Sequence, residues 1–499
     1  MMKSKMQAWA LLIVLALAVP AAWAQQQKDP RVGVPATPLP PIPLGESSSK
    51  TPLDDPTPVP QNALKPDESP LSGAEAFTLG SSGGGRSFVT PSFHFLQFAD
   101  NVGRSATATN IWEGYGSLTG NLSLQYLKSR SQFGADYSAG GMLYSTSNRR
   151  STTYQRLGIS EQITWRRATL MLADSMSYLP ESSFGGGGIG GISSGLFGGL
   201  GNGGIGTGLG GGFGGSGGLG VGGIGSNFLP GQSILSGAGR RISNSALGQF
   251  SYMLSSRASL TFNGSYGLLH FLDSGFVDSN NYQFSTGYSY KLNAADSIGV
   301  IYAASFLRFS GIAQSANFHN VQLAYGRRLT GRLALRLTGG PQFGTFDNPV
   351  NGSGSRVSWA MHSSLLYNVR NTSLGLNYSH SASSGSGVLV GSDADRIDGT
   401  IGRQLSRMWH GGLVFGYAHN KGIQQLNATT VPRQINTWHA GFNLQRPLSR
   451  QANLTFTYNL TGQSANNPTG CVGVACGHLP LRHQLALGIS WGFGPYVID

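Results

Sequence analysis

Two cysteines carry the most reactive side chains of the sequence. Cys471 and Cys476 stand close together in a segment rich in Gly and Asn, with no further His or Cys ligands at zinc-like spacing around them. In an exported chain, which the N-terminus discussed below indicates, such a close pair is typical of a local disulfide. The sequence therefore predicts a Cys471–Cys476 bridge that fixes the shape of one loop more than it raises global stability.

Three histidines are candidates for acid-base chemistry. Barrel enzymes that hydrolyse lipids or peptides need a His with Ser or Asp on one rim, but His380, His419 and His439 fall on different segments without an evident common partner. Each is more simply a polar residue near the level of lipid headgroups. We therefore predict no enzymatic activity.

Two acidic residues interrupt registers that are otherwise apolar. The register of Glu161 holds Leu, Ile and Trp, and that of Asp174 holds Leu, Met and Tyr. Because a carboxylate that faces lipid is costly, either a β-bulge turns these side chains inward or they face a contact with protein.

Basic residues gather at or beside short turns, where they would form a ring. Such side chains either reach anionic phospholipid headgroups or bias a pore toward anions. Arg166, Arg167, Arg327 and Arg328 are the candidate rim and selectivity residues. The full set is Lys128, Arg130, Arg166, Arg167, Arg257, Arg327, Arg328, Arg332, Arg370, Arg407, Arg446 and Arg450.

A glycine-rich insert at 183–240 contains chance matches to the GxGxxG phosphate-binding pattern. A nucleotide site would also need a buried parallel strand before the glycines and a helix after them, and neither is indicated. Spaced Ile, Leu and Phe residues within 185–225 are compatible with a mobile surface loop, with adhesion or with inward folding. No cofactor and no nucleic-acid partner is expected.

The elements that must position these residues begin after two leading segments. Lys3 and Lys5 precede an apolar run at 8–19, and the small-x-small pattern at 22–24 then predicts a signal peptide removed after residue 24. Residues 25–85 are rich in proline and poor in large apolar residues, so we expect a disordered tail.

From residue 86 onward the sequence alternates with a period of two. One face is apolar and aromatic, and the other carries Ser, Thr, Asn, Gln and Gly where a soluble sandwich usually carries Lys and Glu. Charged residues are 11% of the chain, against roughly a quarter in soluble domains. Segments of about ten to twelve residues also match the length that crosses a bilayer at a tilt.

The alternation predicts eighteen strands joined by short and long connections in turn. The predicted long connections are 99–115, 145–153, 179–244, 269–281, 308–317, 344–356, 383–395, 420–434 and 463–481. The predicted strands are 88–98, 116–127, 132–144, 154–165, 168–178, 245–254, 257–268, 282–292, 296–307, 318–328, 332–343, 357–368, 372–382, 396–406, 409–419, 435–445, 451–462 and 482–493.

The signal sequence, the period of two and the alternating connections resemble the porin-like class of Gram-negative outer-membrane β-barrels. The resemblance covers residues 88–495 and implies an all-β, antiparallel, up-and-down transmembrane barrel of about sixteen to eighteen strands. Residues 180–186 faintly resemble the inward-folding third loop of general porins. The chain departs from the class in its proline-rich tail and in its ending at 494–499, where a terminal aromatic residue is usual.

The resemblance implies a passive channel for small hydrophilic solutes. Two other functions stay open: a structural or adhesive surface protein anchored by its barrel, and an exporter subunit for a secreted polymer. The implied location is the outer membrane with the tail in the periplasm. Implied partners are outer-membrane lipids, the barrel-assembly machinery and, through the tail, the cell wall or a periplasmic protein.

Overall fold

The computed structural model describes most of the chain after the tail. It covers residues 87–498 except 103–110, 145–150, 180–233, 235–239, 275, 311–313, 331, 349–351, 370–371, 384–386, 424–433, 450 and 467–478. The predicted signal peptide, the tail, the two cysteines and all of the 183–240 insert except Ile234 and Arg240 lie outside these residues.

Strands make up nearly all of the described chain. No helix in this part of the chain is long and apolar enough to span a membrane. The strands are β1 (Ser87–Val102), β2 (Ile111–Leu127), β3 (Ser131–Tyr144), β4 (Thr152–Thr164), β5 (Ala168–Leu179), β6 (Arg241–Met253), β7 (Ala258–Phe271), β8 (Ser279–Lys291), β9 (Asp296–Phe309), β10 (Gln314–Thr330), β11 (Leu333–Asn348), β12 (Gly352–Val369), β13 (Thr372–Ser383), β14 (Ser392–Gln404), β15 (His410–Gly422), β16 (Gln434–Pro447), β17 (Ala452–Ala465), β18 (Leu479–Gly492) and β19 (Tyr496–Ile498). Each of the eighteen predicted segments corresponds to one of β1 to β18.

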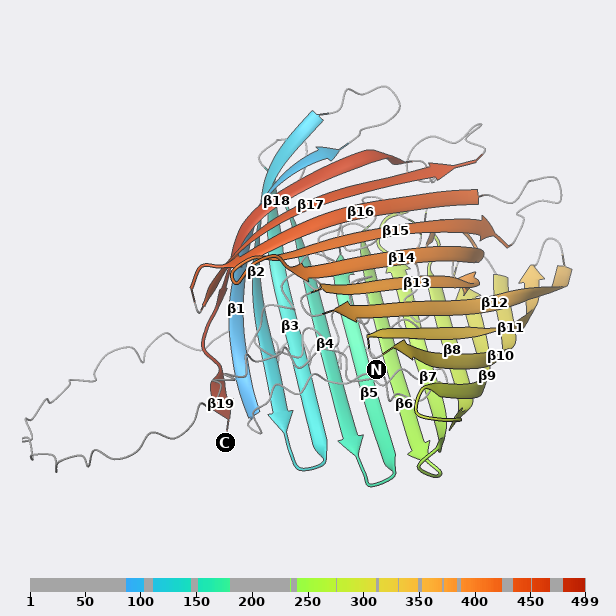
Figure 1. Ribbon diagram of the computed structural model, residues 1–499. Helices are drawn as coiled ribbons and strands as arrows, with labels where there is room; N and C mark the ends of the chain where they lie inside the picture. The colour runs from blue at the N-terminus through green and yellow to red at the C-terminus, as the bar shows by residue number, and fades with distance from the viewer. Residues whose placement is uncertain are drawn as a thin grey trace, which may run out of the picture. The chain divides into compact units, whose positions relative to one another are not determined.

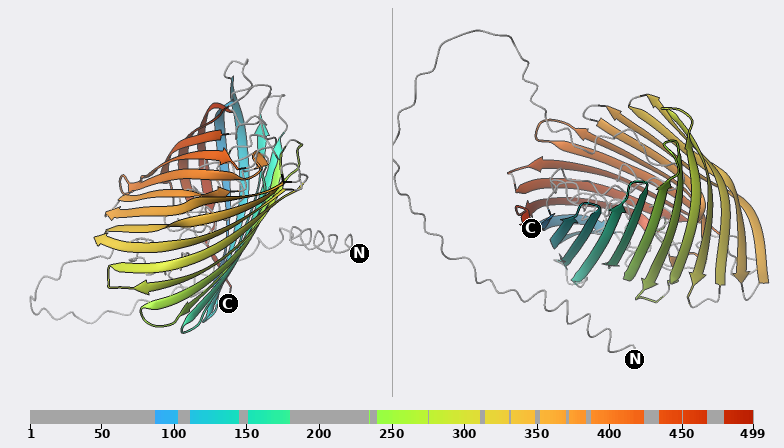
Figure 2. Two further views of the ribbon diagram at one scale, coloured as in Figure 1. Left: turned by 90° about the vertical axis from the view of Figure 1, so that its right-hand side faces the viewer. Right: turned by 90° about the horizontal axis from the view of Figure 1, so that it is seen from below.

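The strands form one antiparallel sheet that closes on itself. Each strand from β2 to β17 pairs with the strands before and after it in the chain, and β1 pairs with β18 from Ser92↔Gly492 to Asp100↔Gln484, which closes the ring. Figures 1 and 2 show this succession of neighbours around the ring. The predicted up-and-down barrel is therefore confirmed, with eighteen strands in the ring.

Side chains alternate between an apolar outer face and a largely polar inner face. On β1, Phe93 and Phe95 are about half exposed on the outside, whereas His94 and Leu96 between and after them are buried inside. The outer face carries Trp, Tyr, Phe and Leu at both ends of the strands, and the inner face carries Ser, Thr, Asn and Gln. This arrangement satisfies the backbone between strands and presents apolar atoms to lipid.

All nine predicted long connections are shorter than expected, and the two beside β10 to β12 are reduced to a few residues. β10, β11 and β12 extend past the apolar zone, so that only 310–313 and 349–351 separate the strands there. The added residues are polar on the outer face, with contacts such as the hydrogen bond from Ser315 Oγ to Asp347 Oδ2 at 3.0 Å, whereas Ala316 and Phe346 pack on the inner face. The predicted strands stop too early because the apolar outer face, on which the prediction relied, ends before the strands do.

The unusual C-terminal ending forms a short additional strand. β18 stops at Gly492, and β19 then pairs with the start of β1, from Val89↔Tyr496 to Ser87↔Ile498. Phe93 and Phe493 lie edge to face beside this break, with ring centroids 6.0 Å apart. The last residues of the chain thus complete the seam that β18 begins.

Candidate functional site on the inner wall of the barrel

A row of polar side chains crosses the inner wall from β11 to β18. Its members stand directly opposite one another on successive strands, so one lateral line joins them. Most are charged or can form hydrogen bonds, in contrast to the outer face. The row, called here the inner polar row, is Arg336, Ser364, Asn377, Asp398, Gly416, His439, Thr461 and Arg482.

An ion pair lies at the centre of the inner polar row. Arg396 Nε donates to Asp398 Oδ2 at 2.5 Å, and both side chains are mostly buried. The two residues share the inner face because they are two positions apart on one strand. The pair is thus fixed within a single strand and does not depend on a neighbouring loop.

Gly416 makes room for the ring of His439 beside this pair. A Cβ atom at residue 416 would lie 2.1 Å from His439 Cε1 and 2.8 Å from Asp398 Oδ1. A side chain at this position would therefore displace the histidine ring from the carboxylate. The glycine on β15 allows the imidazole of β16 to approach the cation and the anion of β14.

A second ion pair closes the row at the barrel seam. Arg482 on β18 binds the carboxylate of Asp100 on β1, with Nε 2.8 Å from Oδ1, and Asp100 is fully buried. Beside it Gln484 Nε2 donates to Tyr115 Oη on β2 at 2.7 Å. The first and last strands are thus joined by side chains as well as by backbone hydrogen bonds.

The inner wall of β2 to β4 is polar as well. Tyr154 reaches from β4 over Gly140 of β3 to β2, where its hydroxyl lies 3.3 Å from Ser117 Oγ and also contacts Thr119. A Cβ at Gly140 would lie 2.5 Å from Tyr154 Cζ. Here too a glycine permits an inward side chain to cross a neighbouring strand.

An apolar segment lies against the inner face where the long connections are. This mouth segment, Gly387–Gly391, has the sequence Gly-Val-Leu-Val-Gly between β13 and β14. Both glycines have left-handed backbone angles, with φ of 76° and 74°. These angles turn the chain back at each end, and a side chain at either position would be strained.

The mouth segment contacts strands on two sides of the ring. Leu389 is buried with Ile435 of β16 and with Ile234 of the glycine-rich insert. Val390 packs against a cluster that includes Phe309 and Phe318 of β9 and β10. The segment therefore joins strands that are far apart in the sheet order.

Backbone contacts hold the first glycine of the mouth segment in place. Gly387 O accepts a hydrogen bond from Val277 N at 2.9 Å, and a Cβ at residue 387 would lie 2.1 Å from the ring of Phe271. Inward folding was one of the alternatives left open for the insert at 183–240, and it stays a prediction because the insert lies outside the described residues apart from Ile234 and Arg240. The structure places the mouth segment, between β13 and β14, on the inner side.

The predicted basic residues that are described lie at the end of the strands where the turns are short. Arg166 and Arg167 are exposed in the turn between β4 and β5. Arg327 and Arg328 lie near the end of β10 and, being adjacent, point to opposite faces. Arg370 and Arg450 lie outside the described residues.

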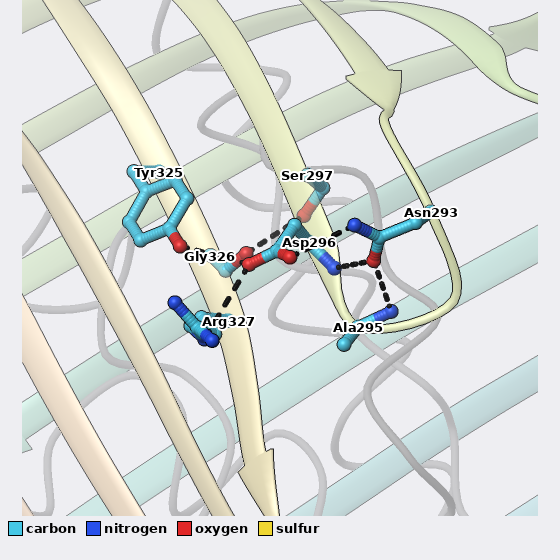
Figure 3. A network of polar contacts seen from close by, with 7 residues as sticks. All are labelled: Asn293, Ala295, Asp296, Ser297, Tyr325, Gly326 and Arg327. Atoms are coloured by element: carbon cyan, nitrogen blue, oxygen red, sulfur yellow. Dashed lines mark hydrogen bonds and ion pairs between the residues drawn. The ribbon is translucent and has the colours of Figure 1, made fainter.

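Arg327 belongs to a polar network on the outer face (Figure 3). Its Nε lies 3.7 Å from Asp296 Oδ1, and the same carboxylate accepts hydrogen bonds from Tyr325 Oη at 2.8 Å and from Asn293 Nδ2 at 2.9 Å. Arg328 takes the inward position beside Ala324 and Gly326, which are buried. Of this pair, Arg328 faces the inside of the barrel.

Glu161 and Asp174 lie on the outer face of regular strands. The pairing of β4 with β3 and with β5 continues through both residues without a register shift, so the predicted bulge is not present. Glu161 accepts a hydrogen bond from Ser131 Oγ at 3.1 Å, and Asp174 accepts one from Asn244 Nδ2 at 2.8 Å. The alternative, a contact with protein, stays a prediction for these two residues.

The three histidines fall into two environments. His439 lies inside on the inner polar row, whereas His380 and His419 lie outside on β13 and β15. Contrary to the expectation from sequence, His380 and His419 do share a neighbour, because Asp395 of β14 stands directly between them. Among the described residues, no group of three or more His, Cys, Asp or Glu is placed to hold a metal ion.

Sequence reasoning missed the ion pairs and the mouth segment. One signal for Arg396 and Asp398 was present, because they flank Ile397 and must share the face opposite to it. The apolar run Val388-Leu389-Val390 within a glycine- and serine-rich connection was a signal for the mouth segment. No signal in the sequence indicated which residues stand opposite each other on neighbouring strands, because this register depends on every hairpin.

These features define a class of protein. A closed antiparallel ring with an apolar outside and a polar inside is the architecture of a porin-like outer-membrane β-barrel, because only a closed sheet satisfies its backbone within lipid. The strand pairing and the alternation of the chain itself carry this assignment.

Comparison with known proteins gives structural matches only. No family model and no curated protein matches the chain. Crystal structures of Pseudomonas aeruginosa OpdK with vanillate and Acinetobacter baumannii OccAB3 are each similar over 82% of this chain and 99% of theirs, with 11% identity and a TM-score of 0.39. That of P. aeruginosa OccK2 (OpdF) in complex with glucuronate is similar over 83% and 98%, with 10% identity and a TM-score of 0.39.

Proposed function

We propose that the protein is a passive channel for small hydrophilic solutes in the Gram-negative outer membrane. The inner polar row is the observation that carries this proposal. It presents donors, acceptors and fixed charges to the inside of the ring, where an anchoring barrel requires none. Rings and rows of such groups are what select solutes in pores.

The mouth segment would control entry at one end. Its Val and Leu side chains offer no hydrogen bonds to a solute, so they would disfavour water and ions in the part of the mouth that they cover. The contacts of Leu389 and Val390 tie it to two parts of the ring, and displacing it would break both. The same packing favours a second candidate, in which the barrel is closed and serves as an anchor for surface loops.

The proposed orientation places the short turns and the N-terminal tail in the periplasm and the long connections outside. Short periplasmic turns and longer outer loops are the rule for such barrels. Outer-membrane lipids, the assembly machinery and a cell-wall or periplasmic contact of the tail remain proposed partners. Surface labelling of a tag at residues 50–60 on intact cells would contradict this orientation.

Planar-bilayer recording of the refolded full chain tests the channel. We expect discrete conductance steps, with insertion checked by heat-modifiable gel migration of the same sample. Heat-denatured protein is the control for detergent artefacts. A folded, inserted barrel that neither conducts nor supports swelling of liposomes in small sugars would favour the anchor instead.

A further inference from the structure

A polar patch interrupts the apolar outer face of the barrel at the ends of β13 to β16. These ends adjoin the long connections. His380, Asp395, His419 and Asn436 stand opposite one another on four successive strands. This line is called here the outer polar row. In the proposed orientation it lies at the level of the outer-leaflet headgroups.

The outer polar row contains one arrangement twice. Tyr378 Oη and His380 Nδ1 both contact Asp395 Oδ1, at 2.9 and 2.7 Å. On the next pair of strands, Tyr417 Oη and His419 Nδ1 both contact Asn436 Oδ1, at 3.0 and 2.6 Å. Each Tyr-x-His pair thus donates to a single oxygen on the following strand.

These bonds fix what the imidazoles offer to a ligand. A carboxylate oxygen and an amide oxygen can only accept, so Nδ1 of each histidine carries the proton. Nε2 is left as an acceptor when the ring is neutral and as a donor when it is protonated. Two such atoms on strands separated by one other strand suit a ligand with several hydroxyl or phosphate oxygens.

Aromatic side chains border the outer polar row and present open faces. Trp359 stacks on His380 with ring centroids 4.1 Å apart and remains 48% exposed. Tyr417 and Trp438 stand opposite each other one step toward the centre of the membrane. Exposed rings beside fixed hydrogen-bonding groups suit a sugar, whose CH face stacks while its hydroxyls bond. Lys421, exposed beyond His419, adds a positive charge for a phosphate.

We infer that the outer polar row binds the phosphorylated sugar headgroup of an outer-leaflet glycolipid. The acyl chains would lie along the apolar residues below the row, such as Leu376 and Phe415, which are exposed. A phosphoglycerol headgroup can use the cation and an imidazole, but it has no sugar ring to stack on the exposed aromatic side chains. The inference rests on the proposed orientation and is independent of whether the barrel conducts.

Binding of purified lipid A to the detergent-solubilised full chain tests the inference, with phosphatidylglycerol as the comparison lipid and native mass spectrometry as the readout. The variant His380→Gln/His419→Gln should lose about tenfold in affinity for lipid A and clearly less in affinity for phosphatidylglycerol. Its bilayer conductance should equal that of the parent chain, which separates this test from that of the channel.

His319→Gln is the matched control. Its imidazole also lies on the outer face and contacts a tyrosine, with Nδ1 2.8 Å from Tyr302 Oη, but it is not part of the outer polar row. This variant should bind lipid A like the parent chain. Equal loss in both variants, equal loss of both lipids, or unchanged lipid A binding by the double variant would overturn the inference. A change of oligomeric state in the double variant would assign the patch to contact between copies, which also overturns it.

Discussion

Asp100 and Arg482 lie on the first and last strands of the barrel, and their side chains form an ion pair across the closing seam. The pair stands beside the hydrogen bond between Gln484 and Tyr115, so charge and polarity converge where the ends of the sheet meet. The carboxylate is fully buried, whereas the guanidinium is about one quarter exposed. Removing either residue should therefore lower the stability of the barrel, because the charge of the remaining partner loses its counter-ion.

The first prediction concerns this seam. Arg482→Gln should lower the free energy of unfolding by about 3–5 kcal/mol, because it leaves the Asp100 carboxylate buried without its cation. Urea titration in lipid vesicles, followed by gel migration, measures the change. Arg240→Gln is the control, since its ion pair with Asp273 is exposed and screened by solvent, so its loss should change the free energy of unfolding far less. Equal effects of the two changes would contradict the role of the seam.

The second prediction concerns the mouth segment. Leu389→Asn places an amide among Ile234 and Ile435, which cannot satisfy it, and should loosen the segment. Single-channel recording should then show larger or more frequent openings than in the parent chain. Leu448→Asn, in an exposed turn at the other end of the barrel, should leave the openings unchanged. Identical recordings for Leu389→Asn and the parent would rule out a gating role for the segment.

The third prediction distinguishes two neighbouring arginines. Arg328→Gln should reduce any anion preference of the pore, because Arg328 points inward and its field acts on passing ions. Arg327→Gln should not, because Arg327 lies on the outer face beside Asp296. Reversal potentials in a salt gradient measure both, and the difference should fade as ionic strength rises. An equal effect of the two substitutions would mean that the selectivity of the pore does not depend on whether the arginine points inward or outward.

The fourth prediction is a pH dependence at the other end of the barrel. Hydrogen bonds from Arg240 hold the pKa of Asp273 below its usual range. Because the pKa is depressed in the folded state, the contact contributes stability above the ordinary Asp value of about 3.9, and this contribution is lost as pH falls through the folded-state pKa. The effect should be small because both side chains are largely solvated.

Hydrogen exchange at Leu272 N reports this contact, since that group donates to Arg240 O at 2.9 Å. Acidification should raise the local opening constant in the parent chain, after correction for the intrinsic pH dependence of exchange. In the Asp273→Asn variant, the opening constant at Leu272 N should be similar at every pH. A parent chain whose opening constant does not respond to acid would contradict the assigned contact.

Local patterns predicted the strands because alternation is a property of a few consecutive residues. Phe284 and Tyr288 on one face and Ser285 on the other predict β8 without reference to any other segment. The same reasoning stopped short at β10 to β12, where the outer face becomes polar. It also located Glu161 and Asp174 in outward registers, although it favoured a bulge that the regular pairing does not contain.

The site could not be derived in the same way because it is made by register. That Asp395 stands between His380 and His419, and that Asp398 stands near His439, depends on how far each strand is shifted against the next. A shift of one residue would turn every one of these side chains to the other face. Such shifts accumulate around eighteen strands, and no short stretch of sequence records their sum.

The pairing of β19 with β1 has a consequence for how the chain can be completed. Without Tyr496–Ile498, the start of β1 would pair only with β2 and would keep an open edge, which is a template for joining a strand of another molecule. Tyr496–Ile498 therefore remove this edge. A chain truncated after β18 could still close its ring through the pairing of β1 with β18, but the start of β1 would stay an unpaired edge. Such a chain should aggregate more readily than one that keeps Tyr496–Ile498.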